Sequence, residues 1–586
     1  MSTTSSRGAA AYTPTATRGP GLFADRDLIL TNLWVAIVAF GVAACMAVMQ
    51  ALSRASLDVP YRSPRMYYMS VTAHGILMAL VFTTFFIMAL GDVVVDTEIG
   101  GLPSRALARV SYTVAIIGTL MTLATVFAFK ASVLYTFYPP MQAHPAFYIG
   151  LTLLVVGSWG WAVNVIIAWM RARRAHPDRP VSLAMHATAV NALLWLLATI
   201  GVACEMLFQL IPWSLGLEAR IDPLLARTLF WFFGHPLVYF WVLPAYAIWY
   251  TVLPREAGGK LFSDPLGRMT FTLFLIISVP VGLHHQFQDP GISAGWKLFH
   301  TFNTMVIVFP SLVTAFTICA SLEVAGRLRG GTGLFGWIGA LPWQNPLVSS
   351  ALCAMLLFMI GGFGGVVNAS FALNSVVHNT AWIPGHFHLT VGSAVALTFM
   401  GTAYWLVPKV SGRNLELELL ARVQPFLWFA GMFLFGVSNH LTGLMGMPRR
   451  IFEGAYAGQP EAHMWQALTW VSAMGGVILF VSAMFFVMVM LATLLAGQRS
   501  AQEPIVWAEP LTTPADGVRP GIWDGLWPWF AVAVVLAAVG YVMPLSDILH
   551  LTRYGAQGSR PSEETRTCAP PSLAYSAASP SPARSS

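Results

Sequence analysis

The segment that decides the fold is residues 226–253, ARTLFWFFGHPLVYFWVLPAYAIWYTVL, in which Arg227 is the only residue of the Asp, Glu, Lys or Arg type. A helix that crosses a lipid bilayer needs about 20 mostly apolar residues, and this segment is long enough. It does not alternate between polar and apolar positions as the short strands of a membrane β-barrel do. We therefore predict a transmembrane helix here.

The remainder of the sequence has the same character. Of the 586 residues, 56% are hydrophobic and 10% are charged, whereas a soluble domain has about 25% charged residues. So few charges cannot cover a water-exposed surface, which excludes an ordinary cytosolic enzyme, a nucleic-acid-binding protein and a disordered chain. We predict an all-α polytopic membrane protein with about thirteen transmembrane helices. The predicted spans are 29–53, 66–91, 107–129, 145–170, 187–212, 226–253, 268–288, 301–325, 346–367, 380–408, 422–446, 464–496 and 525–547.

The two ends of the chain differ from this bundle. We predict a disordered cytoplasmic N-terminal tail over 1–28, a transmembrane bundle over 29–550 and a disordered C-terminal tail over 551–586. The N-terminal stretch lacks the apolar core of a secretory signal peptide. Lys and Arg are more numerous in the segments that face inward when the N-terminus is cytoplasmic, so we expect that orientation, with the C-terminus on the outer side.

Six histidines of the predicted helices share one depth. They are His74, His235, His284, His285, His386 and His388. At about 1.5 Å of rise per residue, all six fall in the outer third of the bilayer. Ionisable residues inside a membrane are costly and indicate function. The shared depth predicts one buried site with several ligands.

The spacing of these histidines separates the ligands. His386 and His388 diverge by about 200° on a helix, so they suit two different cofactors. His284 and His285 diverge by about 100° and are neighbouring ligands only where the helix is bent. Pro280 and Gly282 lie just before them and supply such an irregularity.

A third imidazole, from His235, would complete a site with three nitrogen ligands. Imidazole suits copper, zinc or iron, so the spacing does not name the metal.

Three motifs together resemble subunit I of the heme-copper oxygen reductases. They are WFFGHPLVY at 231–239, HHQFQDPG at 284–291 and HNTAWIPGHFH at 378–388. The resemblance covers nearly all of the chain between the tails. It implies two hemes, one low-spin of b- or a-type and one high-spin of a3-type, and one copper, CuB.

The resemblance also implies a role for each histidine. His74 and His388 match the axial ligands of the low-spin heme, and His386 matches the ligand of the high-spin heme. His235, His284 and His285 match the CuB ligands. Tyr239 matches the tyrosine that is covalently joined to His235, which makes these two the catalytic residues.

The activity that this family implies is that of a terminal respiratory oxidase, a proton-translocating cytochrome c oxidase. It reduces O₂ to water with four electrons, coupled to proton uptake and pumping, in the bacterial cytoplasmic (inner) membrane. The cysteines contain no pair suited to a dinuclear copper centre. The implied partners are therefore a subunit II that carries this centre, cytochrome c as donor, O₂, the lipid bilayer and a small single-helix subunit, with no nucleic acid.

One position indicates the branch of the family. Leu237 stands where the mitochondrial-like branch has the glutamate that ends its main proton channel. The chain resembles instead the ba3-type oxidases of thermophilic bacteria, which use one proton path to the tyrosine. The matching positions are Tyr246, Tyr250, Ser311, Thr314 and Thr317. Since Tyr239, Tyr246 and Tyr250 are spaced i, i+7 and i+11, they share one helix face.

The outer loops carry further matches. Arg449 and Arg450 match the arginines that hold heme propionates, and paired guanidiniums suit carboxylates. His378 and Asn379 match the cluster beside those propionates.

Three polar residues are left open at this point. Asn374 stands where the branch has Asp, and because Asn cannot ionise, its part in pumping is open. Arg227 and Asp289 lie on the outer side of the copper ligands, where we expect them to pair. Glu205 is an acid within a predicted span and has no assigned partner.

Two other functions remain as alternatives. A nitric oxide reductase of the same superfamily would have added glutamates and would lack the tyrosine, so Leu237 and Tyr239 argue against it. A non-catalytic protein for membrane transport or heme handling would not need six histidines in two cofactor geometries.

Overall fold

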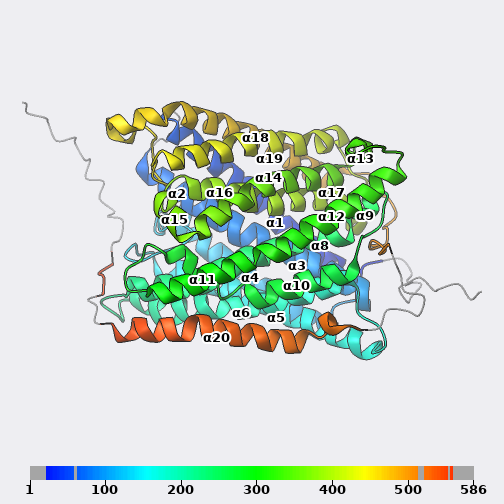
Figure 1. Ribbon diagram of the computed structural model, residues 1–586, viewed down its shortest axis with the longest axis horizontal. Coiled ribbons are helices and arrows are strands. Elements are labelled where there is room, and N and C mark those ends of the chain that lie inside the picture. Colours follow the sequence, from blue (N-terminus) through cyan, green and yellow to red (C-terminus); the bar gives the residue numbers. More distant parts are fainter. Residues whose placement is uncertain (1–21, 58–62, 512–519, 552–554, 559–586) are drawn as a thin grey trace, which may run out of the picture.

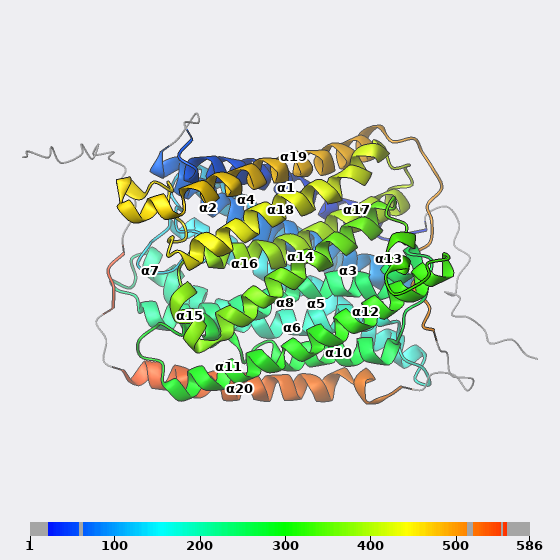
Figure 2. The same ribbon diagram turned by 45° about the horizontal axis from the view of Figure 1, so that its top comes forward.

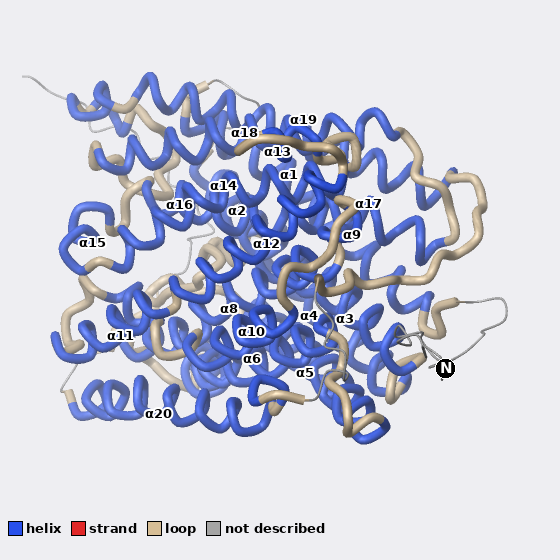
Figure 3. The backbone as a smooth tube through the Cα atoms, turned by 45° about the vertical axis from the view of Figure 1, so that its right-hand side comes forward, coloured by secondary structure: helices blue, strands red, loops and turns tan. Residues whose placement is uncertain are grey.

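The computed structural model describes residues 22–57, 63–511, 520–551 and 555–558. Within these ranges the regular structure is helical, as the blue segments of Figure 3 show, and strand pairing is limited to isolated bridges. The helical elements are α1 Arg26–Arg54, α2 Pro64–Ile76, η1 Leu77–Phe82, α3 Thr83–Ile99, α4 Arg105–Phe127, α5 Pro145–Ala175, α6 Leu183–Glu205, η2 Met206–Leu210, α7 Ile211–Ser214, α8 Pro223–Thr251, α9 Leu253–Glu256, α10 Asp264–Ile277, η3 Gly282–Gln286, α11 Ala294–Val306, α12 Val308–Leu328, α13 Gly336–Ala340, α14 Pro346–Ala369, α15 Phe371–Val377, α16 Trp382–Thr390, η4 Val391–Val395, α17 Ala396–Ser411, α18 Glu418–Leu444, η5 Tyr456–Gly458, η6 Pro460–Met464, α19 Gln466–Ala496, η7 Ile522–Asp524 and α20 Leu526–His550.

The long helices lie side by side, with their axes roughly along the longest dimension of the molecule (Figure 1). In the described residues, twelve helical segments are long and apolar enough to cross a membrane. The predicted all-α membrane fold is confirmed. Below, "outer" denotes the end of the bundle where α2 begins and α18 ends, and "inner" denotes the opposite end.

The number of continuous spans is where prediction and structure differ. The predicted span 268–288 is a helix of 14 residues, α10, followed by a 3-10 turn, η3. Pro280 lacks a backbone N–H and follows closely on the end of α10 at Ile277, so the helix does not continue to the histidines. The expected irregularity before His284 is thereby confirmed, and the continuous spans number twelve rather than thirteen among the described residues.

The ends of the chain are described only in part. Residues 1–21 of the predicted N-terminal tail, and 552–554 and 559–586 of the predicted C-terminal tail, lie outside the described residues. Within the C-terminal region, Ala556 exchanges two backbone hydrogen bonds with Ile221, at 3.1 and 2.8 Å. This contact ties the segment after α20 to the loop before α8.

Short polar residues followed by proline start several of the spans. The Asp222 carboxylate accepts hydrogen bonds from the backbone N–H groups of Leu224 (3.0 Å) and Leu225 (3.2 Å). Pro223 follows it at the first helical position, where its missing N–H costs nothing. These caps fix the outer end of α8, the helix that carries His235.

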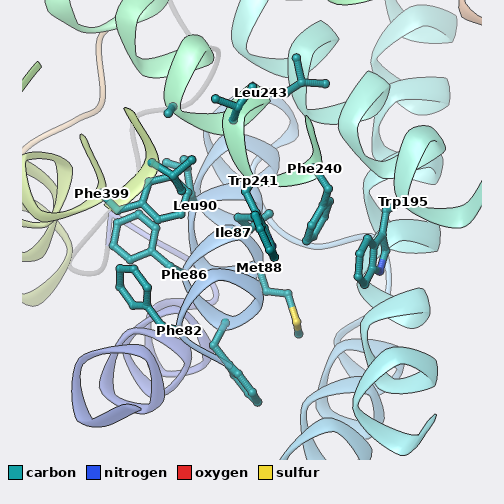
Figure 4. Packing of buried hydrophobic residues seen from close by; sticks show 14 of the residues in the cluster. Phe82, Phe86, Ile87, Met88, Leu90, Trp195, Phe240, Trp241, Leu243 and Phe399 are labelled. Atoms are coloured by element: carbon teal, nitrogen blue, oxygen red, sulfur yellow. The ribbon is translucent and has the colours of Figure 1, made fainter. Parts of the chain in front are cut away.

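Aromatic stacking holds the centre of the bundle together (Figure 4). Phe86 of α3 stacks on Phe399 of α17 at 4.4 Å between ring centroids, and Trp195 of α6 stacks on Phe240 of α8 at 4.0 Å. Such pairs contribute about 0.5–1.5 kcal/mol beyond the burial of their area. The first pair links α3 to α17, and the second links α6 to α8.

The last helix, α20, runs along one edge of the bundle beside α10 and α11 (Figures 1 and 2). At its inner end, Arg268 of α10 pairs with Asp524 of η7 at 2.8 Å, and both side chains are buried. Removing one partner of a buried pair leaves an uncompensated charge, so this contact fixes where α20 begins.

Candidate heme and copper sites

Three imidazoles converge at the outer side of the bundle. His235 comes from α8, and His284 and His285 come from η3; their ligand nitrogens all lie within 4.8 Å of one another. His235 Nδ1 is 3.3 Å from His285 Nε2. His235 and His284 are buried, at 7% and 6% exposure. The three residues predicted as metal ligands therefore form a site that fits a copper, zinc or iron ion.

The turn that carries His284 and His285 is held by α11. His284 Nδ1 lies 2.8 Å from Thr304 Oγ1, whose own hydroxyl donates to the carbonyl of His300. The Leu283 N–H donates to His300 Nδ1 at 3.3 Å, and His300 Nε2 donates to the carbonyl of Gly540 in α20 at 2.9 Å. His284 Nε2 is thus available to a metal. In metal sites, a hydrogen bond at one ring nitrogen of a ligand histidine usually fixes the ring so that the other nitrogen binds the metal.

Sequence reasoning missed His300 because the predicted span began at residue 301, whereas α11 begins at Ala294. It missed Thr304, which lies within that span, because a lone threonine in an apolar helix has no distinguishing pattern of its own. Their i, i+4 spacing just after the adjacent His pair was the available signal.

Thr304→Val is expected to weaken metal binding at the three-histidine site by about 10–100-fold, the usual effect of losing a hydrogen bond to a ligand histidine. Metal content is measured after dialysis against graded chelator. Thr301→Val is the matched control, since Thr301 donates to the carbonyl of Lys297 in its own helix. Equal metal retention in both variants would show that Thr304 does not position His284.

Tyr239 lies one turn after His235 on α8. Its ring centroid is 4.9 Å from that of His235. His235 Nδ1 points to the metal site, while its Nε2 is buried and has no hydrogen-bond partner among the described residues. A buried ring nitrogen without a partner is rare, and here it leaves one atom of His235 available to the neighbouring phenol.

His74 and His388 form a second site. Their rings are parallel, at 4°, with centroids 6.3 Å apart. His74 Nδ1 bonds the carbonyl of Ala43 at 3.0 Å and His388 Nδ1 bonds that of Pro384 at 2.7 Å, so Nε2 is free on both. Two metal–nitrogen bonds of about 2 Å and two ring radii of about 1 Å sum to about 6 Å, which fits a metal between the rings.

A cavity of about 220 Å³ surrounds this pair of rings. Its walls are mostly apolar residues of α1, α2, α16, α18 and α19, and its outer end carries Arg54, Arg449 and Arg450. An apolar slot with cations at one end suits a flat macrocycle with acidic substituents. The arrangement fits a heme whose two axial ligands are histidines.

The outer loop lies beside Asn379 through the backbone of Arg449. The Arg449 N–H donates to the carbonyl of Asn379 at 3.0 Å, and Asn379 has a positive φ of 59°. Burial, followed by the charge of Arg450, lowers the pKa of Arg449 to about 10. No ion pair joins either arginine to a carboxylate within the described residues. A buried guanidinium of this kind suits an acidic group of a ligand.

His386 faces the three-histidine site. Its Nδ1 bonds the carbonyl of Gly361 at 2.8 Å, which frees Nε2, and it interacts electrostatically with His235, His284 and His285. A Cβ on Gly365 would lie 3.0 Å from His386 Cε1, so glycine in α14 leaves room beside this ring. The Nε2 of His386 is therefore available as a ligand atom near the metal site.

Two histidines lie close to the His386 site. His440 of α18 stacks on Trp382 at 4.1 Å, and its buried Nε2 has no partner among the described residues; sequence reasoning missed it because it stands alone in its span. Burial, with Arg449 and then Arg227, lowers the pKa of His378 to about 4, so His378 is neutral at pH 7.

The predicted hydroxyl row forms between α8 and α12. Tyr246 hydrogen-bonds to Ser311, and Tyr250 does so to Thr314 (3.2 Å) and Thr317. Ser321 continues the row one turn further inward: its hydroxyl donates to the Thr317 carbonyl and it accepts the N–H of Phe262. It was missed although it follows Thr317 at i+4.

The remaining outer residues also have defined partners. Arg227 pairs with Asp289 at 3.0 Å, as expected, and Gln286 donates to the same carboxyl at 3.0 Å. Burial raises the pKa of Asp289, which Arg227 opposes. Asn374 is buried and donates to the carbonyl of Asn368 at 2.7 Å.

Known proteins share this arrangement. A protein-family model described as "Cytochrome C and Quinol oxidase polypeptide I" matches residues 27–478. Cytochrome c oxidase subunit 1 of Thermus thermophilus is 45% identical over 482 residues, which are 81% of this chain and 85% of that protein. Cytochrome c oxidase subunit 1 of Synechocystis sp. is 28% identical over 460 residues, 75% of this chain and 78% of the relative. A solved structure described as a heme-copper terminal oxidase dimer has a TM-score of 0.87 at 37% identity and covers 92% of this chain and 95% of its own. The family match spans both histidine sites.

Proposed function

The chain belongs to the cytochrome c and quinol oxidase polypeptide I family, as subunit I of a heme-copper terminal oxidase, and from this we propose that its two histidine sites together reduce O₂ to water. The observation that carries the proposal is the three-imidazole cluster of His235, His284 and His285, which His386 faces. A metal at each of these two sites would allow O₂ to bind between them.

We propose that the three clustered histidines hold CuB, that His386 holds a high-spin heme, and that His74 and His388 hold a low-spin heme. When bound, these groups supply the electrons and an open coordination position for O₂. The chain orients them through the Nδ1 hydrogen bonds of His74, His388, His386 and His284. Arg449 and Arg450, beside His378 and Asn379, would bind the propionates, and their partly buried guanidinium groups favour acidic groups.

Tyr239 would supply a proton and an electron at the site. Its ring lies beside His235, and the unpartnered Nε2 of His235 supports a covalent link between the two. The phenol is about two turns outward of Tyr246 on the same face of α8. Tyr246 and Tyr250, with Ser311, Thr314 and Thr317, would carry protons to Tyr239 from the inner side.

The inner row of hydroxyls and Leu237 support the branch with one proton path, and so does the 45% identity to the Thermus thermophilus relative. As a multi-pass subunit I, the chain works in a complex with other subunits. We propose that a subunit II with a dinuclear copper centre passes electrons from cytochrome c, and that a single-helix subunit joins them. The membrane would be the bacterial cytoplasmic one, with the N-terminus inside and proton pumping outward.

Metal and pyridine-hemochrome analysis of the purified protein tests this function. We expect two hemes and one copper per chain, and a reduced optical spectrum in which CO shifts one heme and leaves the other unchanged. Iron beyond the two hemes, without copper, would favour a nitric oxide reductase. A protein without stoichiometric heme would contradict both.

A further inference from the structure

Glu205 is a fully buried acid that the proposed oxygen chemistry does not use. It ends α6 at 0% exposure, and both of its carboxyl oxygens lack a hydrogen-bond partner among the described residues. One turn later, the buried Oε1 of Gln209 also lacks a partner. Buried polar atoms are nearly always hydrogen-bonded, so three such oxygens within one helical turn, without donors among the described residues, indicate that something binds to them.

The backbone beside Glu205 has the same irregularity as the backbone beside the heme ligands. The described residues contain three π-helical segments. Two of them, η1 and η4, begin three residues after His74 and His388. The third, η2, begins directly after Glu205 and includes Gln209. Single π turns within α-helices are rare and are frequent at functional sites.

In the part of the chain that the structure describes, no Lys or Arg side chain is paired with Glu205. A Cβ on Gly201, one turn before Glu205, would lie 2.7 Å from the carbonyl of Leu229, so this face of α6 packs on α8. Arg227 is about 200° around α8 from Leu229 and is paired with Asp289. On the far side of η2, Leu207 and Phe208 are exposed at 53% and 73%, toward lipid. An ionised Glu205 would be uncompensated, which favours the neutral acid.

We propose that Glu205 and Gln209 form a hydrated proton-binding site in which Glu205 holds the proton. One water satisfies every group: it accepts the acid proton of Glu205 and donates its two hydrogens to the Glu205 carbonyl and Gln209 Oε1. This site lies on the α6 side of α8, apart from the hydroxyl row between α8 and α12. It does not depend on the roles proposed for the histidines.

Infrared spectroscopy of the holoenzyme in membranes tests the site. We expect the C=O band of a protonated carboxylic acid that shifts to lower frequency in D₂O and is lost in Glu205→Gln. Glu256→Gln is the matched control and should leave this band unchanged, because Glu256 accepts N–H bonds from Trp405 (2.9 Å) and Asn345 (3.3 Å) at the inner end. The optical spectrum of the hemes reports that each variant is assembled.

Gln209→Leu provides the second measurement. It should keep the band and move it to higher frequency, since the bridging water loses one acceptor. The proposal would be overturned if the wild-type spectrum had no carboxylic acid band that Glu205→Gln removes. A carboxylate bound to a metal cation would give such a spectrum. An unshifted band in Gln209→Leu would overturn the water bridge, and this variant decides the question if Glu205→Gln does not assemble.

Discussion

Tyr239→Phe is expected to lower the rate of O₂ reduction by about 10²–10⁴-fold, the usual contribution of a positioned proton donor. The change removes one hydroxyl and keeps the ring that packs 4.9 Å from His235, so hemes and copper should bind as before. Oxygen uptake with excess reductant measures the rate, and metal analysis shows that the site is intact.

The control for this change is Tyr404→Phe. Tyr404 is also buried, and its hydroxyl donates to Gln424 at 3.2 Å near the inner end of α17. It should keep most of the activity. If Tyr239→Phe turned over O₂ as fast as Tyr404→Phe, the phenol would have no part in the reaction.

His74→Ala is expected to abolish the low-spin heme signal and to reduce turnover by about 100-fold or more. This loss exceeds the one expected when only a hydrogen-bond partner of a metal ligand is removed. His388 alone cannot hold a six-coordinate iron, and the electron route to the three-histidine site is then broken. The reduced-minus-oxidised optical spectrum and oxygen uptake measure the two effects. The CO-binding signal of the other heme should persist.

His144→Ala serves as the matched histidine control. His144 is exposed and caps the start of α5, with its Nδ1 3.2 Å from the Ala146 N–H. If the low-spin spectrum survived in His74→Ala, His74 would not be an axial ligand. The cavity that Arg449 and Arg450 line would then bind a group other than this heme.

The clustering of the six histidines could be predicted because depth and helical spacing are local properties of the sequence. Two residues of separation place His386 and His388 on opposite faces in any helix. The hydrogen bonds that position those histidines could not be predicted, because they depend on which helices pack together. His300, for example, bonds the carbonyl of Gly540, which is 240 positions away in the chain. The π-helical segments after His74, Glu205 and His388 likewise have no sequence pattern that distinguishes them from an ordinary apolar span.

The largest error of the sequence-based prediction was the span 268–288, which was expected to be one helix but ends as α10 at Ile277. Hydropathy runs continuously through Ile277, Pro280 and Leu283, and a window of about 20 residues averages over a break. The bend itself was visible in Pro280, but the consequence, a 3-10 turn held by α11, required the tertiary contacts of Thr304 and His300.

The contacts of α20 bear on the order in which this protein is made. The turn that carries His284 and His285 depends on His300, which is anchored by Gly540, and the carbonyl of Trp231 beside that turn accepts the hydroxyl of Tyr541 at 3.2 Å. Both anchors lie in α20, 240 positions after His300 in one case. The turn therefore takes its final shape only after α20 has been synthesised and has packed against α8 and α11.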